Sequence, residues 1–446
     1  MKTARLLDRP TGLLALMLGA QLALGGCAAP REAAPEPAPV AVSAPAPAPA
    51  PTPAAQPEQP PAPADDGSDW PAWRGPAGSG ISPERAWTSG GRELWSRNVG
   101  AGYSQASVVG ERLYTSGFYE ARGVDATVCL DAETGAELWR QEHPAVNLDN
   151  MHKGGTLTTP TVADGRVYVL CRLGELFAFD AESGELDWSI DLEADHGIER
   201  GYFGLPSSPY RYKDLLLISV GPTLAFDPTD GELVWSSKDY GYSYATPTSF
   251  ALDGRDHLAV FNGAGLTILD PADGSEQALH EWTSGYNVNC ATPIVIGDRI
   301  FISTGYDDRG CAMLRLTPAG LELMWESVAM LNKMNGCVLV DDHLYGFHAQ
   351  QLACMTLDGE VLWKRRGLGL GTVIAAGSPG EERLIVLSED GQLLVGPASP
   401  AGFEPESEEQ VLPAGPCWST PVLSRGRIYV RNQAGTLVCR DHRAMP

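Results

Sequence analysis

An eleven-residue phrase recurs along this chain and constrains its fold more than any other feature. It reads CLDAETGAELW over residues 129–139, AFDAESGELDW over residues 178–188 and AFDPTDGELVW over residues 225–235. Each copy contains an apolar run, an aspartate, a turn that ends in glycine, a second apolar run and a closing tryptophan. This is the pattern of a β-hairpin, because glycine supplies the left-handed conformation that a tight turn needs. Its recurrence at a fixed period predicts a repeat architecture.

Weaker copies of the phrase extend the repeat through the rest of the chain. The closing positions are residues 95, 139, 188, 235, 282, 325, 363 and 407, which lie 38 to 49 residues apart. This period is typical of a propeller blade of four strands. A strand rich in β-branched and aromatic residues precedes each hairpin, and most of these follow a shorter strand that begins near Thr-Pro or Ser-Pro. We therefore predict an all-β protein, an eight-bladed β-propeller of four-stranded antiparallel blades, with seven blades as the main alternative.

The two ends of the repeat complement each other. The last copy begins at Val438 and reaches Asp441 without the glycine and tryptophan that complete the phrase, whereas GRELW at residues 91–95 matches GAELW at residues 135–139. We expect the N-terminal strand to complete the last blade. Such closure is favourable because an open ring leaves unpaired blade edges.

The N-terminal residues carry targeting and spacing signals ahead of the repeat. Residues 1–26 combine a basic start with an apolar run and end at Leu24-Gly25-Gly26-Cys27, which resembles a bacterial lipoprotein cleavage box. We predict a signal peptide over 1–26, a lipid anchor on Cys27, a Pro/Ala-rich disordered tether over 27–67 and the propeller over 68–446. By the same resemblance, Ala28 favours the outer membrane over the inner one. Residues 69–84 are too rich in Trp, Pro and Gly for a strand, and we expect them to form a strap on the propeller surface.

The charge balance restricts the possible partners. The chain has 32 basic and 56 acidic residues, a formal net charge of −24. Nucleic-acid binding requires a basic footprint, and attraction to anionic lipid requires clustered Lys and Arg. We therefore predict no nucleic-acid partner, and membrane association through the lipid on Cys27 alone.

The repeated phrase resembles the tryptophan-docking motif of the PQQ-like propellers. That family includes quinoprotein alcohol dehydrogenases and the lipoprotein of the outer-membrane β-barrel assembly machinery; DWPAWRGP at residues 69–76 is also similar to exported PQQ-like proteins of planctomycete type. The resemblance covers roughly residues 91–446 and implies that each tryptophan packs between adjacent blades. The implied docking residues are Trp95, Trp139, Trp188, Trp235, Trp282, Trp325 and Trp363.

The sequence lacks several of the features that the resemblance implies for a quinoprotein dehydrogenase. It requires PQQ stacked on tryptophan, a disulfide between adjacent cysteines, Ca²⁺ and an aspartate base. The eight cysteines after Cys27 are isolated in sequence, no Cys-x-x-Cys-His haem motif occurs, and no His-Glu-x-x-His, Gly-x-Ser-x-Gly or P-loop motif is present. We expect no cofactor and no metal site and identify no catalytic residue, with PQQ and calcium as the alternative. The sequence leaves the disulfide state of these cysteines open; Cys290 and Cys337 are one candidate contact.

The loops that lead into the first strand of each blade differ from the rest of the repeat, because they carry bulky polar and aromatic residues. In a propeller such loops converge on one mouth of the central channel. Either they fill the channel with hydrogen bonds, or they form a locally basic pocket for an anionic or aromatic ligand or an extended peptide. The candidate binding residues are Lys153, Arg200, Tyr202, Asn289, Lys333, Asn335 and Trp418.

These observations favour a monomeric, lipid-anchored periplasmic propeller that binds envelope proteins as an assembly scaffold, without turnover. The first alternative is a PQQ-dependent alcohol or sugar dehydrogenase. The second is a module that binds a small ligand or a peptide at the channel mouth.

Overall fold

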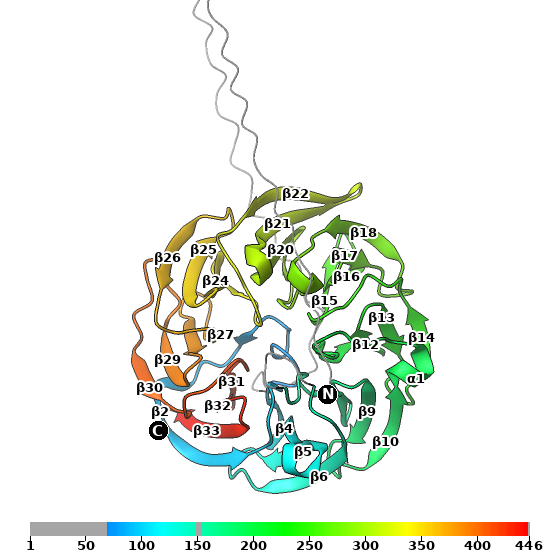
Figure 1. Ribbon diagram of the computed structural model, residues 1–446. Helices are drawn as coiled ribbons and strands as arrows, with labels where there is room; N and C mark the ends of the chain where they lie inside the picture. Colours follow the sequence, from blue (N-terminus) through cyan, green and yellow to red (C-terminus); the bar gives the residue numbers. More distant parts are fainter. Residues whose placement is uncertain (1–68, 149–153, 445–446) are drawn as a thin grey trace, which may run out of the picture. The chain divides into compact units, whose positions relative to one another are not determined.

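The computed structural model describes residues 69–148 and 154–444, which form eight small β-sheets around a central channel (Figure 1). The prediction of an all-β, eight-bladed propeller is confirmed, and the seven-bladed alternative is wrong. The signal peptide, Cys27 and the tether lie outside the described residues. Within residues 69–148 and 154–444, no helix has the length and apolar character needed to cross a membrane.

Each blade contains a four-stranded antiparallel sheet. In blades 1 to 7 these strands follow one another in sequence from the channel outwards, whereas blade 8 takes its outermost strand from the N-terminal side of the ring. Blade 1 is β3 (Ser107–Val109), β4 (Arg112–Tyr119), β5 (Val124–Asp131) and β6 (Glu137–Pro144); blade 2 is β7 (Thr161–Ala163), β8 (Arg166–Leu170), β9 (Glu175–Asp180) and β10 (Leu186–Asp191). Blade 3 is β11 (Tyr210–Tyr212), β12 (Leu215–Ser219), β13 (Thr223–Phe226) and β14 (Leu233–Ser236); blade 4 is β15 (Thr248–Leu252), β16 (Arg255–Phe261), β17 (Gly265–Leu269) and β18 (Glu276–Glu281).

The second half of the ring has the same order, with additions from the N-terminal residues. Blade 5 is β19 (Ile294–Ile296), β20 (Arg299–Thr304), β21 (Gly310–Thr317) and β22 (Gly320–Ser327); blade 6 is β23 (Val338–Val340), β24 (His343–His348), β25 (Gln351–Thr356) and β26 (Val361–Arg365). Blade 7 is β27 (Thr372–Ala376), β28 (Arg383–Leu387), β29 (Gln392–Pro397) and β30 (Ser407–Gln410), extended by β1 (Ile81–Ser82). Blade 8 is β31 (Val422–Ser424), β32 (Arg427–Arg431), β33 (Thr436–Arg443) and β2 (Trp87–Asn98).

The helical elements of the described residues are short and lie in connections between strands. They are the α-helix α1 (Leu192–His196) and the 3₁₀ turns η1 (Glu120–Arg122), η2 (Gly285–Asn287) and η3 (Tyr306–Asp308).

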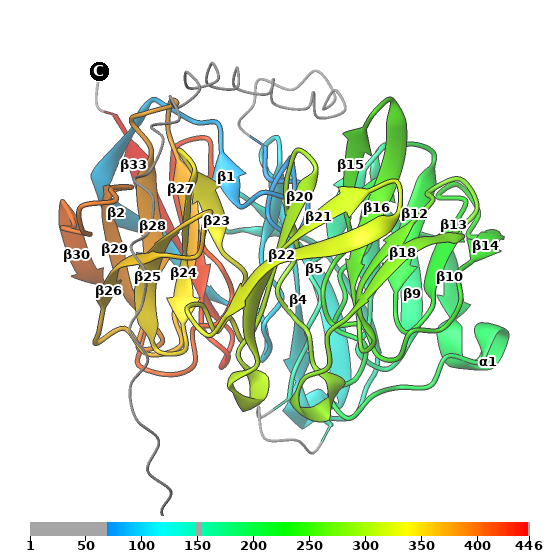
Figure 2. The same cartoon turned by 90° about the horizontal axis from the view of Figure 1, so that it is seen from above.

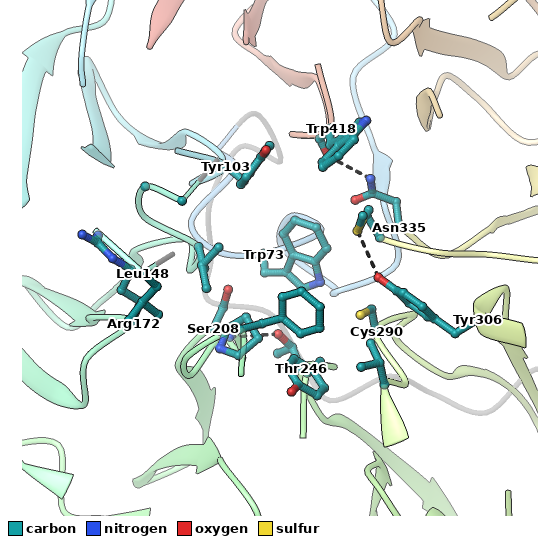
Figure 3. A pocket seen from close by; sticks show the side chains of 18 residues that line it. Trp73, Tyr103, Leu148, Arg172, Ser208, Thr246, Cys290, Tyr306, Asn335 and Trp418 are labelled. Atoms are coloured by element: carbon teal, nitrogen blue, oxygen red, sulfur yellow. Dashed lines mark hydrogen bonds between the residues drawn. The ribbon is translucent and has the colours of Figure 1, made fainter. Parts of the chain in front are cut away.

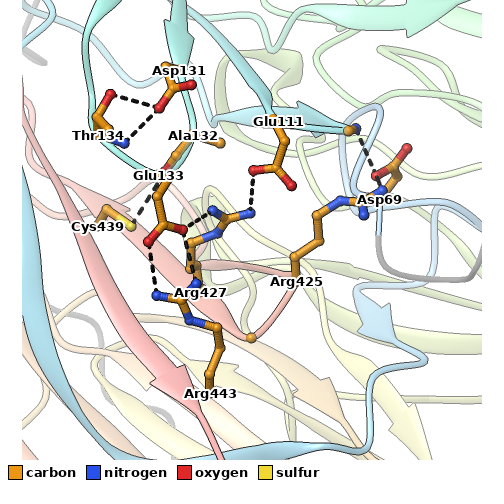
Figure 4. Close-up of polar contacts among 12 residues, drawn as sticks. Asp69, Glu111, Asp131, Ala132, Glu133, Thr134, Arg425, Arg427, Cys439 and Arg443 are labelled. Atoms are coloured by element: carbon orange, nitrogen blue, oxygen red, sulfur yellow. Dashed lines mark hydrogen bonds and ion pairs between the residues drawn. The ribbon is translucent and has the colours of Figure 1, made fainter.

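The N-terminal strand closes the ring, as predicted. β2 pairs antiparallel with β33, with Arg92 opposite Asp441 and Trp95 opposite Cys439. Beside this seam, Arg427 binds Glu133 at 2.5 Å and Glu111 at 3.1 Å, which joins blade 8 to blade 1 (Figure 4). Since Arg427 is 2% exposed, its guanidinium is a buried cation held by carboxylates of the neighbouring blade.

Six of the seven predicted docking tryptophans contact the turn of the next blade. Each donates its indole N–H to a backbone carbonyl there, and in several pairs the turn glycine lies directly against the ring: a Cβ added at Gly184 would lie 2.6 Å from the Trp139 indole. Glycine is favoured at position 184 for two reasons: a Cβ would overlap the indole, and the backbone has φ +76°, which other residues rarely adopt. The donor and acceptor pairs are Trp95 and Ala132, Trp139 and Ala181, Trp188 and Pro228, Trp235 and Pro271, Trp325 and Leu357, and Trp363 and Ser399.

Trp282 does not occupy the docking position. In blade 4 the docking position is occupied by Ala278, which pairs with Ile268 as Trp139 pairs with Cys129 in blade 1. Trp282 lies four residues further along the chain. Trp282 is fully buried, and the Arg309 guanidinium lies 3.4 Å from the centroid of its ring. The prediction for Trp282 is wrong because eight residues separate it from Gly274, whereas four separate Gly135 from Trp139.

Residues 69–84, which we call the strap, enter the channel instead of lying on the surface. Trp70 is fully buried and pairs with Val108 of blade 1 through two backbone hydrogen bonds. Arg74 is 3% exposed and donates to the carbonyl of Cys337 in blade 6. The strap then forms β1, which pairs in parallel with β27. The surface prediction is therefore wrong, because the indole and guanidinium groups of this segment are buried between the blades.

The eight cysteines from Cys129 to Cys439 are unpaired thiols, seven of them buried. They lie in or beside blades 1, 2, 5, 6 and 8, most of them as small buried residues, and the candidate contact between Cys290 and Cys337 is not a disulfide.

Candidate binding site

The two ends of the channel differ in the segments that cover them. The strap contacts the turns between the first and second strands of the blades, as shown by the hydrogen bonds from Gly110 to Asp69 and from Gly426 to Glu84. The connections between blades lie at the opposite end, which we call the mouth. Figure 2 shows this arrangement, with β1 towards one end of the ring axis and α1, from a blade connection, at the other.

The wall of the mouth is built by the repeat itself. Seven blades place a residue there that stands four positions before the first strand of the blade. Two positions further on, Ser or Thr hydroxyls link blades: the N–H of Thr159 donates to Ser208, and the N–H of Ser208 donates to Thr246. The seven wall residues are Tyr103, Leu157, Pro206, Tyr244, Cys290, Met334 and Trp418.

These residues enclose a pocket of about 130 Å³ at the mouth (Figure 3). The indole of Trp73, from the strap, lies at the centre of the view and forms its floor, and its N–H donates to the Thr292 hydroxyl at 3.1 Å. The strap thus contributes a residue to the lining of this pocket. The remaining lining residues are Leu148, Gly154, Gly155, Arg172, Phe203, Ser208, Thr246, Val288, Tyr306 and Asn335.

Aromatic rings dominate this lining. Tyr103 and Trp418 stack with their centroids 5.2 Å apart and an interplanar angle of 14°. Asn335 donates to the carbonyl of Trp418 at 2.8 Å, and the Trp418 N–H donates to Glu389 at 3.1 Å. These contacts fix the orientation of the indole, so that the pocket presents ring faces to a ligand rather than polar edges.

The charged group of the lining is held by its own neighbours. Arg172 is 1% exposed, and one of its nitrogens binds both carboxylate oxygens of Asp125 at 2.6 Å. Burial raises the pKa of Asp125, whereas the Arg172 charge opposes this shift. Next to this pair, the Cys171 sulfur lies 3.0 Å from His143 Nε2. Burial raises the pKa of the Cys171 thiol and lowers that of His143, so both are neutral at pH 7 and the thiol is not an activated nucleophile.

The opposite wall carries a second thiol beside a phenol. The Tyr306 hydroxyl contacts the Met334 sulfur at 3.5 Å. Burial raises the pKa of Cys290 to about 12 and also raises that of Tyr306. Both groups stay protonated at neutral pH, and this wall offers a ligand an uncharged surface with polarisable sulfur atoms.

The seven candidate residues from the sequence fall into different places. Asn335 and Trp418 line the pocket. Tyr202 is 62% exposed and packs against Phe203 of the lining, with centroids 4.9 Å apart. Asn289 is fully buried, where its amide donates to the carbonyls of Asn262 and Trp282. Lys153 lies outside the described residues.

The expectation of a basic mouth is wrong for the described residues. Arg200 binds Glu193 at 3.1 Å and does not line the pocket, and Lys333 is also absent from the lining. The reason is that these cations follow the repeat register less closely than the aromatic residues do. Trp73 and Tyr103 were missed, although Tyr103 stands four positions before β3, as Trp418 does before β31.

The fold and this site define a class: a PQQ-like, eight-bladed β-propeller with an aromatic-lined pocket at its mouth. The family described as "Outer membrane protein assembly factor BamB" matches residues 85–218 and 216–365, more than half of the chain. The protein belongs to this family. A comparison with curated protein sequences finds no match.

Solved structures with the same fold include a BamB protein and a quinohemoprotein alcohol dehydrogenase, which represent the two kinds of protein that the sequence resembles. BamB from Moraxella catarrhalis has a TM-score of 0.56 at 14% identity, covering 79% of this chain and 100% of that one. Quinohemoprotein alcohol dehydrogenase from Comamonas testosteroni has a TM-score of 0.63 at 14% identity, covering 85% of this chain and 82% of that one. The computationally designed protein Ika8 has a TM-score of 0.53 at 12% identity, covering 78% and 99%. At these identities the similarity shows the fold alone.

The described lining does not fit a quinone with calcium. No Asp or Glu side chain lines the pocket, and residues 69–148 and 154–444 contain no cluster of three His, Cys, Asp or Glu suited to a metal ion. Calcium binds six to eight oxygen ligands that usually include carboxylates. Trp73 and Trp418 provide ring faces for stacking, but the remaining donors of such a site are missing.

Proposed function

We propose that this protein is a cell-envelope propeller that binds other envelope proteins as an assembly scaffold, without chemical turnover. One observation carries the proposal: the strap fills the channel and leaves an aromatic pocket whose described lining lacks carboxylates and holds its one charged group, Arg172, in an internal ion pair. Such a lining binds but does not catalyse acid–base or metal-assisted reactions. Membership of the outer membrane protein assembly factor family supports the same function.

The site of action in this proposal is the periplasmic side of the outer membrane. Lipid on Cys27 anchors the chain, and the Pro/Ala-rich tether over 27–67 holds the propeller away from the bilayer. About forty residues in the polyproline II conformation, at ~3.1 Å each, extend on the order of 100 Å. A monomeric propeller on such a tether reaches partners at a range of distances from the membrane.

Partner capture uses two kinds of surface. The mouth loops supply shape and aromatic contacts, and the outer strands of the blades supply free edges for strand addition. The outer strand β22 is the longest in blade 5 together with β21, and it exposes Leu323 and Met324 at 47% and 40%. Apolar residues on an exposed edge strand are suited to pairing with a partner strand.

The test is affinity purification of the full-length, lipidated protein from detergent-solubilised envelopes after chemical crosslinking. The proposal predicts enrichment of specific envelope proteins relative to a Cys27→Ala variant that is not anchored. Failure of the anchored protein to enrich any partner contradicts it.

The rival function is a PQQ-dependent alcohol or sugar dehydrogenase, and Trp73 and Trp418 favour it by placing two indole faces in the channel. Its test is incubation of the purified protein with PQQ and Ca²⁺, followed by calorimetry and dye reduction with alcohols. Stoichiometric tight binding with dye reduction overturns the scaffold proposal.

A further inference from the structure

The size of the mouth pocket suits one aromatic group. Its volume is about 130 Å³. An engineered cavity of ~150 Å³ in another protein accommodates a single benzene molecule. The pocket is therefore large enough to take one aromatic side chain.

The arrangement of the lining favours contact with ring faces and edges. The stacked pair of Tyr103 and Trp418 forms one wall, and Trp73 forms the floor. On another side, Phe203 meets Tyr244 edge to face, with centroids 6.0 Å apart and planes at 76°. An inserted ring gains stacked contacts on one side and edge contacts on the other, worth about 0.5–1.5 kcal/mol per pair beyond the burial of its area.

The charges of the lining favour an uncharged ring. Arg172 is bound to Asp125 and also donates to the carbonyl of Val146 at 2.9 Å. Its guanidinium also lies over the Phe118 ring, 4.7 Å from the ring centroid. A ligand carboxylate would have to compete with a buried bidentate partner, and a ligand cation would find no carboxylate in the described lining.

The rim of the mouth indicates a ligand that extends beyond the pocket. Three successive blade connections expose large aromatic residues: Tyr202 is 62% exposed, Tyr242 is 37% exposed and Tyr286 is 78% exposed. Exposed tyrosine is enriched at protein interfaces, where it contributes much of the binding energy. A free one-ring molecule would be covered by the pocket without touching these side chains.

The backbone at this rim is strained in a way that functional loops often are. Tyr286 and Asn287 have φ of 60° and 54°, and Asp307 and Asp308 in the adjacent turn have φ of 52° and 50°. Left-handed conformations cost non-glycine residues about 1–2 kcal/mol each. These four residues lie beside the pocket residues Val288 and Tyr306.

We propose that the mouth binds a polypeptide segment by inserting one uncharged aromatic side chain against Trp73 and the Tyr103–Trp418 pair. Residues that flank this side chain lie across Tyr202, Tyr242 and Tyr286. The inference rests on the proposed function, since it identifies the recognition element of the protein partner.

The direct test is selection of binders from a displayed library of random twelve-residue peptides on the intact protein. The selected peptides are expected to share Phe, Tyr or Trp at one fixed position, and its replacement by alanine should weaken binding at least tenfold. Trp418→Ala should weaken binding to a similar degree, whereas Trp418→Phe should retain most of it. Leu362→Ala, on the outer strand β26, is the matched control and should change nothing.

Circular dichroism and urea unfolding verify that each variant is folded. Tyr103→Leu, which keeps an apolar side chain, serves as the second pocket variant if Trp418→Ala does not fold. Selected peptides without a shared aromatic position, or with unchanged affinity for the folded pocket variants, overturn the proposal. Free indole serves as a second probe. If it binds as tightly as the selected peptides, the pocket is a small-molecule site and the peptide proposal is wrong.

The failure of this proposal differs from failure of the proposed function. If the wild type and Trp418→Ala enrich the same envelope partners equally, the scaffold function stands and the pocket does not recognise them. If aromatic peptides bind but no partner is enriched from envelopes, the pocket proposal stands and the scaffold function fails.

Discussion

The two ends of the channel show how one repeat serves stability on one side and binding on the other. At the strap end, Trp70 and Arg74 are buried and the docking turns pack against indoles. At the mouth end, Tyr202 and Tyr286 are exposed on the connections between blades. Regions that bind ligands are commonly drawn from the less stable parts of a protein. Substitutions at the strap end should therefore change stability, and substitutions at the mouth should change binding.

The largest expected effect is that of Trp70→Ala. The indole is fully buried among the strands of blades 1 and 8, so its removal should lower the free energy of unfolding by about 3–5 kcal/mol. The measurement is urea unfolding monitored by circular dichroism. Leu138→Ala, at a residue 46% exposed, is the control and should stay within about 0.5 kcal/mol of the wild type. A loss below about 1 kcal/mol for Trp70→Ala would show that the strap does not stabilise the ring.

The docking turns provide a matched pair of glycines. Gly184 and Gly165 both have φ +76°, but only a Cβ at Gly184 meets an indole, that of Trp139, at 2.6 Å. Both alanine variants bear the same backbone strain. Because of overpacking against the indole, the free energy of unfolding should fall by about 1–3 kcal/mol more in Gly184→Ala than in Gly165→Ala. Urea unfolding measures the difference in the free energy of unfolding between the two variants. In a protein that already carries Trp139→Ala, the additional effect of Gly184→Ala should be smaller. Equal losses would contradict the docking role of the indole.

Ring closure should weaken in acid through His442. This side chain is 1% exposed beside β2, its Nδ1 contacts the carbonyl of Thr88 at 2.9 Å, and Nε2 is buried without a partner. Burial lowers the pKa of His442, with Arg440 adding to this shift and Glu409 and Asp441 opposing it. Because the unfolded chain binds a proton more readily, stability falls as the pH drops below about 6.5, by up to about 1.4 kcal/mol per pH unit.

Urea unfolding between pH 7.5 and pH 5.5 tests this dependence. His442→Gln should reduce the dependence of the free energy of unfolding on pH without removing it, because burial also lowers the pKa values of His143, His280 and His348. An unchanged slope in His442→Gln would show that this histidine does not couple closure to pH.

The smallest stability effect is expected at the mouth. Tyr286 is 78% exposed with φ 60°, so Tyr286→Gly relieves backbone strain while it increases the entropy of the unfolded chain. The free energy of unfolding should change by less than about 1 kcal/mol, in the stabilising direction. Tyr202→Ala, which has no left-handed backbone to relieve, should leave stability unchanged. Both variants should weaken binding of the selected peptides. A large loss of stability in either would remove the contrast between the two ends.

The sequence predicted the ring well because its determinants are local and repeated. The hairpin phrase specifies the turns, and the spacing from Gly135 to Trp139 specifies the docking register. Trp282 was misassigned because its spacing from Gly274 is twice as long. The split copy at residues 91–95 and Asp441 predicted the closure that β2 and β33 form.

The pocket was only partly predictable, since its floor comes from outside the repeat. Asn335 and Trp418 were identified from unusual loop composition, but no periodicity indicates where Trp73 lies. Its position depends on the path of the strap, which is fixed by long-range contacts such as that between Arg74 and Cys337. Tyr103 could have been found from its distance of four residues to the first strand of its blade, the same as for Trp418.

The most direct test of the account is photo-crosslinking in intact cells that express the full-length protein. A benzophenone side chain is placed at Tyr202 or Tyr286 on the mouth, and at Ala77, an exposed residue of the strap, as the matched control. The account predicts adducts with envelope proteins from the two mouth positions and none from Ala77. Adducts of equal yield from both ends, or from Ala77 alone, would contradict the assignment of binding to the mouth.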